Sequence, residues 1–330
     1  MKKIITVVLA ALTCLVFPVG CGAKDNDDRI SVVATIFAPY DFTRQIAGEK
    51  LKVKMLLPPA SESHSYEPSP QDIIAIQKCR VFIYVGGESD VWVDGILESM
   101  DTSKMTIVKL IDCVEPVEEE IKEGMQDDEH EHDEEDEDGD EHDEEEEGEE
   151  HEHEYDEHVW TSPANAKLIV AKITDALCGV DGGNAETYKA NAAAYGAKLD
   201  GLDQKFREIV DAGKRKTIIV GDRYPFRYFT DAYGLDYFAA FPGCATETEA
   251  SAATIAGLID KVKNNNIPVV FKRELSTGNI AATIAEGAGA NVKVLELHSC
   301  HNVTLADFNA GKTYLDIMNA NAEVLKEALS

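Results

Sequence analysis

Short apolar runs alternate with segments of helical spacing in two separate parts of the chain. In the first part, continuous apolar runs such as residues 81–85 predict buried parallel strands, and segments such as residues 70–78 have the spacing of helices. The β-α-β-α-β-α-β order is typical of a parallel sheet covered by helices on both faces. The predicted strands are residues 30–37, 51–57, 81–85 and 106–110, and the predicted helices are residues 39–48, 70–78 and 91–100.

The alternation resumes in the last third of the chain. Between the two parts, aromatic and aliphatic residues in 184–211 recur at three- and four-residue spacing, which predicts one helix of about 25 residues, roughly 38 Å long. We therefore expect an α/β fold with two parallel-sheet lobes joined by one long linker helix, and a ligand cleft between the lobes. The later strands are predicted at residues 217–220, 237–240, 269–271 and 292–297, and helices near residues 164–177, 226–233, 249–264, 279–288 and 312–328.

The N-terminus has the pattern of a secretory signal. Two lysines precede an apolar run over residues 4–17, which is too short for the roughly 20 residues of a membrane span. Cys21 follows a small residue, which resembles a bacterial lipoprotein signal whose cysteine is acylated. We expect an extracytoplasmic protein anchored by lipid to the cytoplasmic membrane. The expected divisions are a signal peptide 1–20, a tether 21–29, an N-terminal lobe 30–183, a linker helix 184–212 and a C-terminal lobe 213–330.

The charge of the chain is concentrated in one segment. The 330 residues carry a formal net charge of −31, and residues 115–157 hold 28 acidic residues against one basic residue, which leaves about −4 for the remainder. A nucleic-acid partner is not expected, because phosphate contacts need clustered Lys and Arg. A like-charged segment cannot bury itself, so residues 115–157 are expected to be a disordered insert. Its histidines predict an auxiliary loop that binds metal weakly: His130, His132, His142, His151 and His153.

Other histidines follow predicted strands. His64 lies after strand 51–57, His158 ends the insert that follows strand 106–110, and His298 directly follows strand 292–297. Ligands of open α/β sheets gather beyond the carboxyl ends of the strands, so these side chains should meet at one edge. Imidazoles with one carboxylate suit zinc. The zinc-protease, serine-hydrolase and phosphate-loop motifs do not occur, and no enzymatic activity is expected.

Two motifs carry a family resemblance. The segment His64-Ser-Tyr-Glu-Pro-Ser-Pro-Gln-Asp-Ile resembles the first metal-ligand loop of the zinc/manganese ABC-transporter substrate-binding lipoproteins, and Asp-Glu-His158-Val-Trp-Thr-Ser-Pro resembles the second. An acidic, histidine-rich loop is typical of the zinc members. The resemblance covers residues 30–330. It implies two pseudo-symmetric lobes with one buried metal, and delivery of Zn²⁺ to the permease and ATPase of an ABC importer. We expect a monomer.

The chain departs from the family at the third ligand. The family's third histidine falls at Arg223, which stays protonated and cannot coordinate zinc. We predict that His298 supplies the third nitrogen and that Arg223 neutralises a nearby carboxylate. His301 is a second candidate, as a ligand or a gate. The carboxylate ligand is left open among three residues: Glu296, where the family's last carboxylate aligns, Glu274 and Asp222.

The sequence also allows alternative functions. The first is a Mn²⁺ receptor of the same family, although manganese prefers more oxygen ligands. The others are an extracellular zinc hydrolase, and an adhesin or zinc-buffering surface lipoprotein. We also predict a disulfide between Cys244 and Cys300, because both follow predicted strands of the second lobe and the compartment permits disulfides. Such a bond would fix the loop that carries His298.

Overall fold

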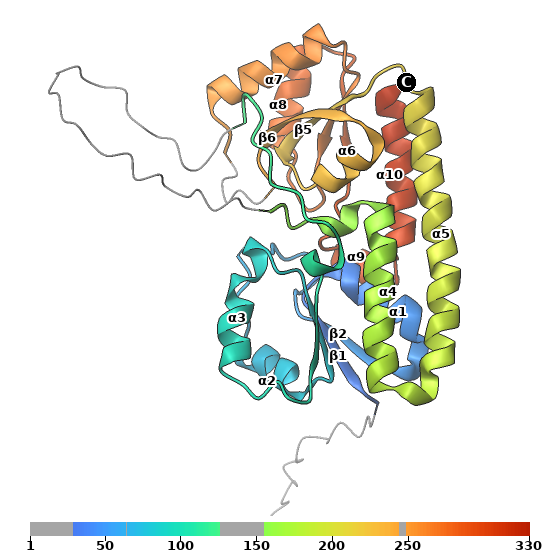
Figure 1. The fold of residues 1–330 in the computed structure, drawn as a ribbon. Helices are drawn as coiled ribbons and strands as arrows, with labels where there is room; N and C mark the ends of the chain where they lie inside the picture. Colours follow the sequence, from blue (N-terminus) through green and yellow to red (C-terminus); the bar gives the residue numbers. More distant parts are fainter. Residues whose placement is uncertain (1–28, 64, 126–154, 244–248) are drawn as a thin grey trace, which may run out of the picture.

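The computed structural model describes residues 29–63, 65–125, 155–243 and 249–330, and these residues form two lobes (Figure 1). Each lobe contains a parallel sheet of four strands, in the orders β2-β1-β3-β4 and β6-β5-β7-β8. The strand order is the same in both sheets, which confirms the predicted α/β fold of two similar lobes. The expected signal peptide, most of the tether and Cys21 lie outside the described residues.

The first sheet has helices on both faces because consecutive residues of its central strands β1 and β3 are apolar, and consecutive residues point to opposite faces. Val32 and Val81 face one cluster of buried side chains, and Val33 and Phe82 face another. Ser69 caps the following α2, and its hydroxyl accepts a hydrogen bond from the Asp72 amide. The elements are β1 (Ser31–Ala34), α1 (Phe37–Ala47), β2 (Lys52–Met55), α2 (Pro70–Lys78), β3 (Val81–Tyr84), α3 (Val91–Glu98) and β4 (Thr106–Lys109).

The second sheet repeats this plan with one longer strand. The predicted strand 217–220 continues to Arg223, which pairs with Phe241 after a register shift. Gly-Asp-Arg has low strand propensity, so the extension carries little sequence signal. The short α9 was not expected from the sequence. The elements are β5 (Thr217–Arg223), α6 (Arg227–Tyr233), β6 (Asp236–Phe241), α7 (Ala252–Asn264), β7 (Val269–Lys272), α8 (Asn279–Ala288), β8 (Lys293–Glu296), α9 (Leu305–Asn309) and α10 (Tyr314–Leu329).

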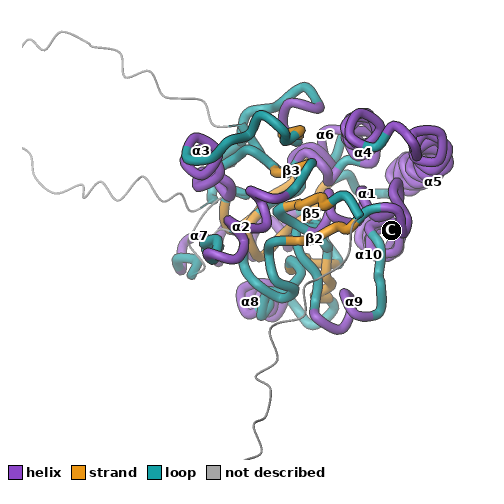
Figure 2. The backbone as a smooth tube through the Cα atoms, turned by 90° about the horizontal axis from the view of Figure 1, so that it is seen from below, coloured by secondary structure: helices purple, strands orange, loops and turns teal. Residues whose placement is uncertain are grey.

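Three long helices lie on one side of the molecule in both views (Figures 1 and 2). They are α4 (Pro163–Val180), α5 (Ala185–Ala212) and α10. The 28 residues of α5 span about 42 Å at 1.5 Å per residue, enough to pass both lobes. Its buried face includes Tyr188, Leu199 and Phe206, which belong to the predicted apolar stripe. Within the described residues, no helix is both long and apolar enough to cross a membrane.

The loops at the carboxyl ends of the two sheets contact each other. The Phe37 amide, after β1, donates to the His301 carbonyl at 3.0 Å, and the Ala60 amide, after β2, donates to the Val303 carbonyl at 2.8 Å. The Trp160 indole donates to the Ser299 carbonyl at 2.8 Å. The loop after β8 is therefore bound to loops of the first lobe, and the junction of the lobes lies where the sequence predicts a ligand cleft.

The flanks of the expected disordered insert make specific contacts. Residues 117–125, here called the strap, cross to the second lobe. The Val117 amide donates to the Tyr228 hydroxyl at 3.1 Å, and Lys122 pairs with Asp236 at 2.6 Å. Residues 115–125 and 155–157, at the two ends of the range that was expected to be disordered, thus belong to the described structure. The auxiliary histidines, from His130 to His153, lie outside the described residues.

Candidate metal centre

His158 is a buried and oriented imidazole at the junction of the lobes. It is 1% exposed, and its Nδ1 lies 3.1 Å from Asp156 Oδ1, which also accepts the His158 backbone amide at 2.8 Å. Because the carboxylate binds Nδ1–H, Nε2 is the nitrogen available to a metal. Burial lowers the pKa of His158, but Asp156, Glu157 and Glu119 outweigh it, and the net shift of the pKa is upward.

Glu157 places a second buried carboxylate beside His158. Its Oε1 lies 3.9 Å from His158 Nε2, and the side chain is fully buried. Ser89 holds it in place: the backbone amide donates to Oε2 at 3.0 Å, and the hydroxyl donates to Oε1. A Cβ on Gly87 would lie 2.4 Å from this carboxylate, so the glycine leaves the space that Glu157 occupies. Sequence reasoning missed Glu157, although it adjoins His158 in the second motif.

The ring of His301 contacts that of His158. The ring centroids are 5.6 Å apart, and Trp160 packs against both rings, at 5.5 Å from His158 and 5.1 Å from His301. His301 is 2% exposed. The structure therefore brings together His158, from the end of the insert, and His301, from the loop after β8.

His64 itself lies outside the described residues, but the loop before it is well anchored. The Asn302 side-chain amide donates to the carbonyls of Pro58 and Ser61, both at 2.8 Å. Because Asn302 follows His301 directly, this contact holds the chain leading to His64 against the His301 loop. The predicted proximity of His64 and His158 stays a prediction.

His298 lies within the second lobe, between the end of β8 and α10. Its backbone amide donates to Asn321 Oδ1 at 3.0 Å, and its Nδ1 accepts the Cys300 amide at 2.9 Å. The side chain adjoins a small pocket also lined by Phe226, Phe229 and Met318. Among the described residues, the ring contacts of His158 are with Trp160 and His301 and not with His298.

The three carboxylates predicted as metal ligands have other partners. Glu274 is buried, and its oxygens accept the amide of Ser299 at 2.8 Å and the Ser299 hydroxyl. Burial raises the pKa of Glu274, but His298, Arg273 and Ser299 lower it more, so the net shift is downward. Glu296 is half exposed and pairs with Lys272 at 3.3 Å. Asp222 lies 3.6 Å from Arg273 Nε.

Arg223 binds a carboxylate, as predicted from its inability to coordinate a metal. Its Nη2 lies 2.7 Å from Glu62 Oε2, and Arg273 Nη2 lies 3.2 Å from the same oxygen. Burial, followed by the charge of Arg273, lowers the pKa of Arg223. Sequence reasoning did not single out Glu62, because nothing local in the sequence pairs it with residues more than 150 positions away.

Neither a complete metal site nor a disulfide is present among the described residues. Across the described ranges, no three His, Cys, Asp or Glu side chains are gathered closely enough to hold a metal ion, and His64 lies outside those ranges. Cys300 is a buried free thiol, and its predicted disulfide partner Cys244 also lies outside them.

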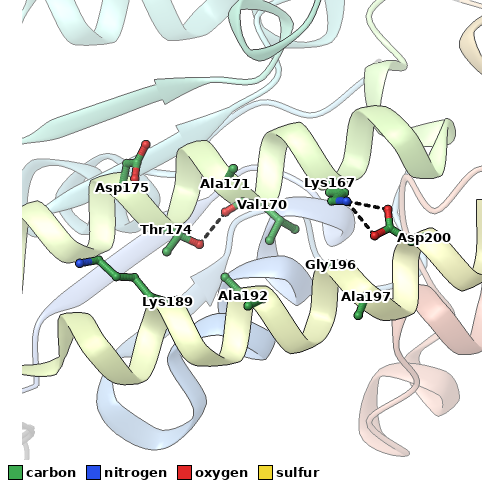
Figure 3. A pocket seen from close by; sticks show the side chains of 11 residues that line it. Lys167, Val170, Ala171, Thr174, Asp175, Lys189, Ala192, Gly196, Ala197 and Asp200 are labelled. Atoms are coloured by element: carbon green, nitrogen blue, oxygen red, sulfur yellow. Dashed lines mark hydrogen bonds and ion pairs between the residues drawn. The ribbon is translucent and has the colours of Figure 1, made fainter.

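A groove between α4 and α5 lies on the outer side of the helices (Figure 3). Its volume is about 370 Å³, and small residues such as Ala192 and Gly196 line it. Lys167 and Asp200 bridge the two helices at 2.7 Å. Neither histidine nor cysteine is among its lining residues.

The chain is similar to known zinc-uptake proteins over nearly its whole length. Residues 32–328 match the family described as zinc-uptake complex component A, periplasmic. The zinc-binding lipoprotein AdcA of Streptococcus pneumoniae serotype 4 is 34% identical over 334 residues, which cover 99% of this chain and 61% of AdcA. The high-affinity zinc uptake system protein ZnuA of Bacillus subtilis is 32% identical over 326 residues, covering 96% of this chain and 95% of ZnuA. The chain thus spans 61% of AdcA and nearly all of that ZnuA.

Solved structures show the same fold. Zn(II)-bound AdcA from Streptococcus pneumoniae superposes with a TM-score of 0.71 at 29% identity, covering 91% of this chain and 58% of that one. The metal-dependent lipoprotein YcdH from Bacillus subtilis gives 0.72 at 28% identity, covering 91% and 99%. The laminin-binding protein Lmb of Streptococcus agalactiae, described as having adhesin and metal-transporting activity, gives 0.70 at 23% identity and covers 91% of this chain and 100% of that one. At that identity, the likeness to Lmb concerns the fold alone.

Proposed function

This chain belongs to the family of periplasmic zinc-uptake component A proteins, and from that premise we propose that it is an extracytoplasmic receptor that binds Zn²⁺ and delivers it to an ABC importer. The observation that carries the proposal is the buried pair His158 and His301, whose ring centroids are 5.6 Å apart at the junction of the lobes. Asp156 orients His158 so that Nε2 is available, an arrangement typical of metal-binding histidines.

The proposed zinc ligands are His64, His158 and His301. The sequence favours His298 for the third nitrogen, whereas the ring contacts favour His301. Glu157 is the proposed carboxylate, because its Oε1 lies 3.9 Å from His158 Nε2. Glu274, Glu296 and Asp222 are less suitable, since their ion pairs are with His298, Lys272 and Arg273 of the second lobe and not with His158. Three imidazoles favour Zn²⁺ over Mn²⁺, which prefers oxygen.

The protein is proposed to perform no bond chemistry on its cargo. A transport receptor needs a metal site shielded from water, whereas a zinc hydrolase keeps an open coordination position. Both His158 and His301 are at most 2% exposed, which supports the receptor function. The proposed partners are a permease and its ATPase, with acylated Cys21 holding a monomeric receptor at the outer face of the cytoplasmic membrane.

Metal analysis and competitive titration of the purified mature protein test this function. The wild type is expected to hold one tightly bound Zn²⁺ in preference to Mn²⁺. His158→Ala and His301→Ala should each weaken zinc binding by more than the roughly 10–100-fold typical of losing an outer-shell partner. His298→Ala should change zinc affinity little, but it should lower the melting temperature of the metal-free protein, because the Cys300 amide loses its acceptor.

His298→Ala and His301→Ala are matched, since both residues lie on the loop after β8. Loss of affinity in His298→Ala together with retention in His301→Ala would assign the third nitrogen to His298. A wild-type protein with no tight zinc site would reject the receptor function itself.

A further inference from the structure

An ion bridge connects the loop that precedes His64 to the second lobe. Glu62 belongs to the first lobe, and its Oε2 lies 2.7 Å from Arg223 Nη2 and 3.2 Å from Arg273 Nη2. Arg223 ends β5, and Arg273 directly follows β7, at the carboxyl edge of the second sheet. One carboxylate therefore binds two guanidinium groups that lie on neighbouring strands of the other lobe.

The two arginines need this carboxylate. Their side chains are only 5% and 9% exposed, so two like charges are buried beside each other. Arg273 has a second partner in Asp222, whose Oδ1 lies 3.6 Å from Nε. Without Glu62, the two buried cations would lose the acid that they share. Removal of one partner from a buried charge group is unfavourable because the remaining charge is left uncompensated.

The bridge acts on a loop that is already hydrogen-bonded to the loop after β8. Asn302 donates to the carbonyls of Pro58 and Ser61, and the Ala60 amide donates to the Val303 carbonyl. Glu62 is the charged contact of this set, and it lies two residues before His64. A cavity of about 530 Å³ adjoins it, and the Glu62 side chain is 38% exposed. Dissolved ions therefore reach the bridge.

We propose that Glu62 is a positioning residue: its bridge to Arg223 and Arg273 holds the His64 loop against the second lobe and so slows the release of zinc. This inference rests on the proposed function, because it takes His64 as a ligand. Glu62 acts through the loop and does not itself touch the metal.

The experiment uses the full-length chain with Glu62→Gln, Glu62→Asp and the control Glu327→Gln. Glu327 pairs with Lys293 at 2.6 Å and is 44% exposed, so it matches Glu62 in chemistry and exposure, but its ion pair lies within the second lobe. Amide hydrogen exchange of the metal-free protein is measured for peptides within residues 56–63 and within α10. Zinc association and dissociation rates are measured by competition with a fluorescent chelator.

Glu62→Gln should accelerate exchange in residues 56–63 at least about fivefold and leave α10 unchanged, because local opening needs only the bridge to break. Zinc dissociation should become about tenfold faster while association changes less than about twofold, as expected when affinity is set by the off-rate. Glu62→Asp should recover part of both effects, and Glu327→Gln should match the wild type. Salt at about 1 M should accelerate exchange in the wild-type loop, since the Glu62 side of the bridge is 38% exposed and dissolved ions screen it there.

Unchanged exchange in Glu62→Gln would overturn the bridge as a clamp. Faster exchange with an unchanged zinc dissociation rate would overturn its role in positioning His64. If the wild type binds no zinc, the proposed function fails, and the exchange result still decides whether the clamp exists. If Glu62→Gln does not fold, Glu62→Asp and the salt series decide the same question, because both weaken the bridge in a folded protein.

Discussion

Asp90 is a buried acid held by backbone amides near the candidate metal centre. Its Oδ2 accepts the amides of Val85 at 2.5 Å and Gly86 at 3.3 Å. Burial, and then the charge of Glu157, raise the pKa of Asp90 from 3.8 to about 7, although the amide hydrogen bonds act in the opposite direction. The folded protein therefore binds this proton more tightly than the unfolded chain, and the stability that the proton provides is lost as the pH rises from about 4 to about 7.

Asp90→Asn should stabilise the metal-free protein at neutral pH. The amide oxygen can accept the same backbone hydrogen bonds without a buried charge. Since one pKa unit corresponds to about 1.36 kcal/mol, we expect the free energy of unfolding to rise by roughly 1–3 kcal/mol at about pH 8 and by much less near pH 4. Urea unfolding at both pH values measures this change. The exposed Asp175→Asn serves as a control, and a variant as stable as wild type at both pH values would contradict the expectation.

Gly243 provides space for His158. A Cβ at this position would lie 3.2 Å from both His158 Cε1 and Glu119 Oε1, and 2.9 Å from the Tyr224 carbonyl oxygen. Gly243→Ala should therefore displace the imidazole and weaken zinc binding about 10–100-fold, as loss of an orienting contact does. Competitive titration measures the change in affinity.

Gly257→Ala is the matched control for Gly243→Ala. Gly257 lies in α7, and a Cβ there would meet no atom within 4 Å. This variant should keep the wild-type zinc affinity and gain up to about 1 kcal/mol of stability, because alanine favours the helix. Equal zinc affinity in both variants would show that the space beside His158 is not needed.

The choice between His298 and His301 shows where residue-level prediction ends. Strand spacing places His298 at the end of β8, and the structure agrees that it follows that strand. Cys300 then adopts a φ of +62°, a conformation that is uncommon for residues other than glycine. The chain turns there, and His301 reaches the ring of His158. A cysteine with a left-handed backbone conformation leaves no trace in the hydrophobic pattern of the sequence. The sequence alone therefore could not predict the contact between His301 and His158.

The strap contains neither a helix nor a strand, but it makes several charged contacts. It packs on the second lobe through Glu119, which accepts the Gly243 amide at 2.7 Å, and through Glu120, which pairs with Arg227. The Lys122 ammonium also lies 4.1 Å from the centre of the Tyr237 ring. A segment without a helix or strand is thus bound to the lobe opposite the one from which it comes.

Two deletions separate the strap from the histidine-rich segment. Replacing residues 126–154 with a short Gly/Ser linker should leave the melting temperature unchanged and keep one tight zinc site, because His158 and the strap remain. Deleting residues 117–154 should lower the melting temperature by roughly 2–4 °C for each kcal/mol by which the strap stabilises the fold. Scanning calorimetry and zinc titration measure both outcomes. Loss of the tight site in the shorter deletion would mean that the histidine-rich segment builds the primary site.

For the whole molecule, the sequence predicts the architecture better than the contacts between its parts. Apolar runs indicate the central β-strands because these are buried on both faces, as in β3, and the stripe on α5 indicates a helix long enough for both lobes. The bridge from Glu62 to Arg223 and Arg273 joins residues far apart in sequence, and charged residues in loops are compatible with many pairings. Such a pairing is decided by the relative position of the lobes, which no local pattern encodes.

The length of α5 has a mechanical consequence for the proposed site. A bend of about 1° at its middle, roughly 21 Å from either end, displaces that end by about 0.4 Å. Metal–ligand distances vary by only about ±0.2 Å. The flexural stiffness of α5, and of α1, α4 and α10 packed along it, therefore limits how accurately the two lobes can present their ligands to one ion. Substitutions that make α5 more flexible would weaken the discrimination between ions of different radius while leaving every coordinating atom in place.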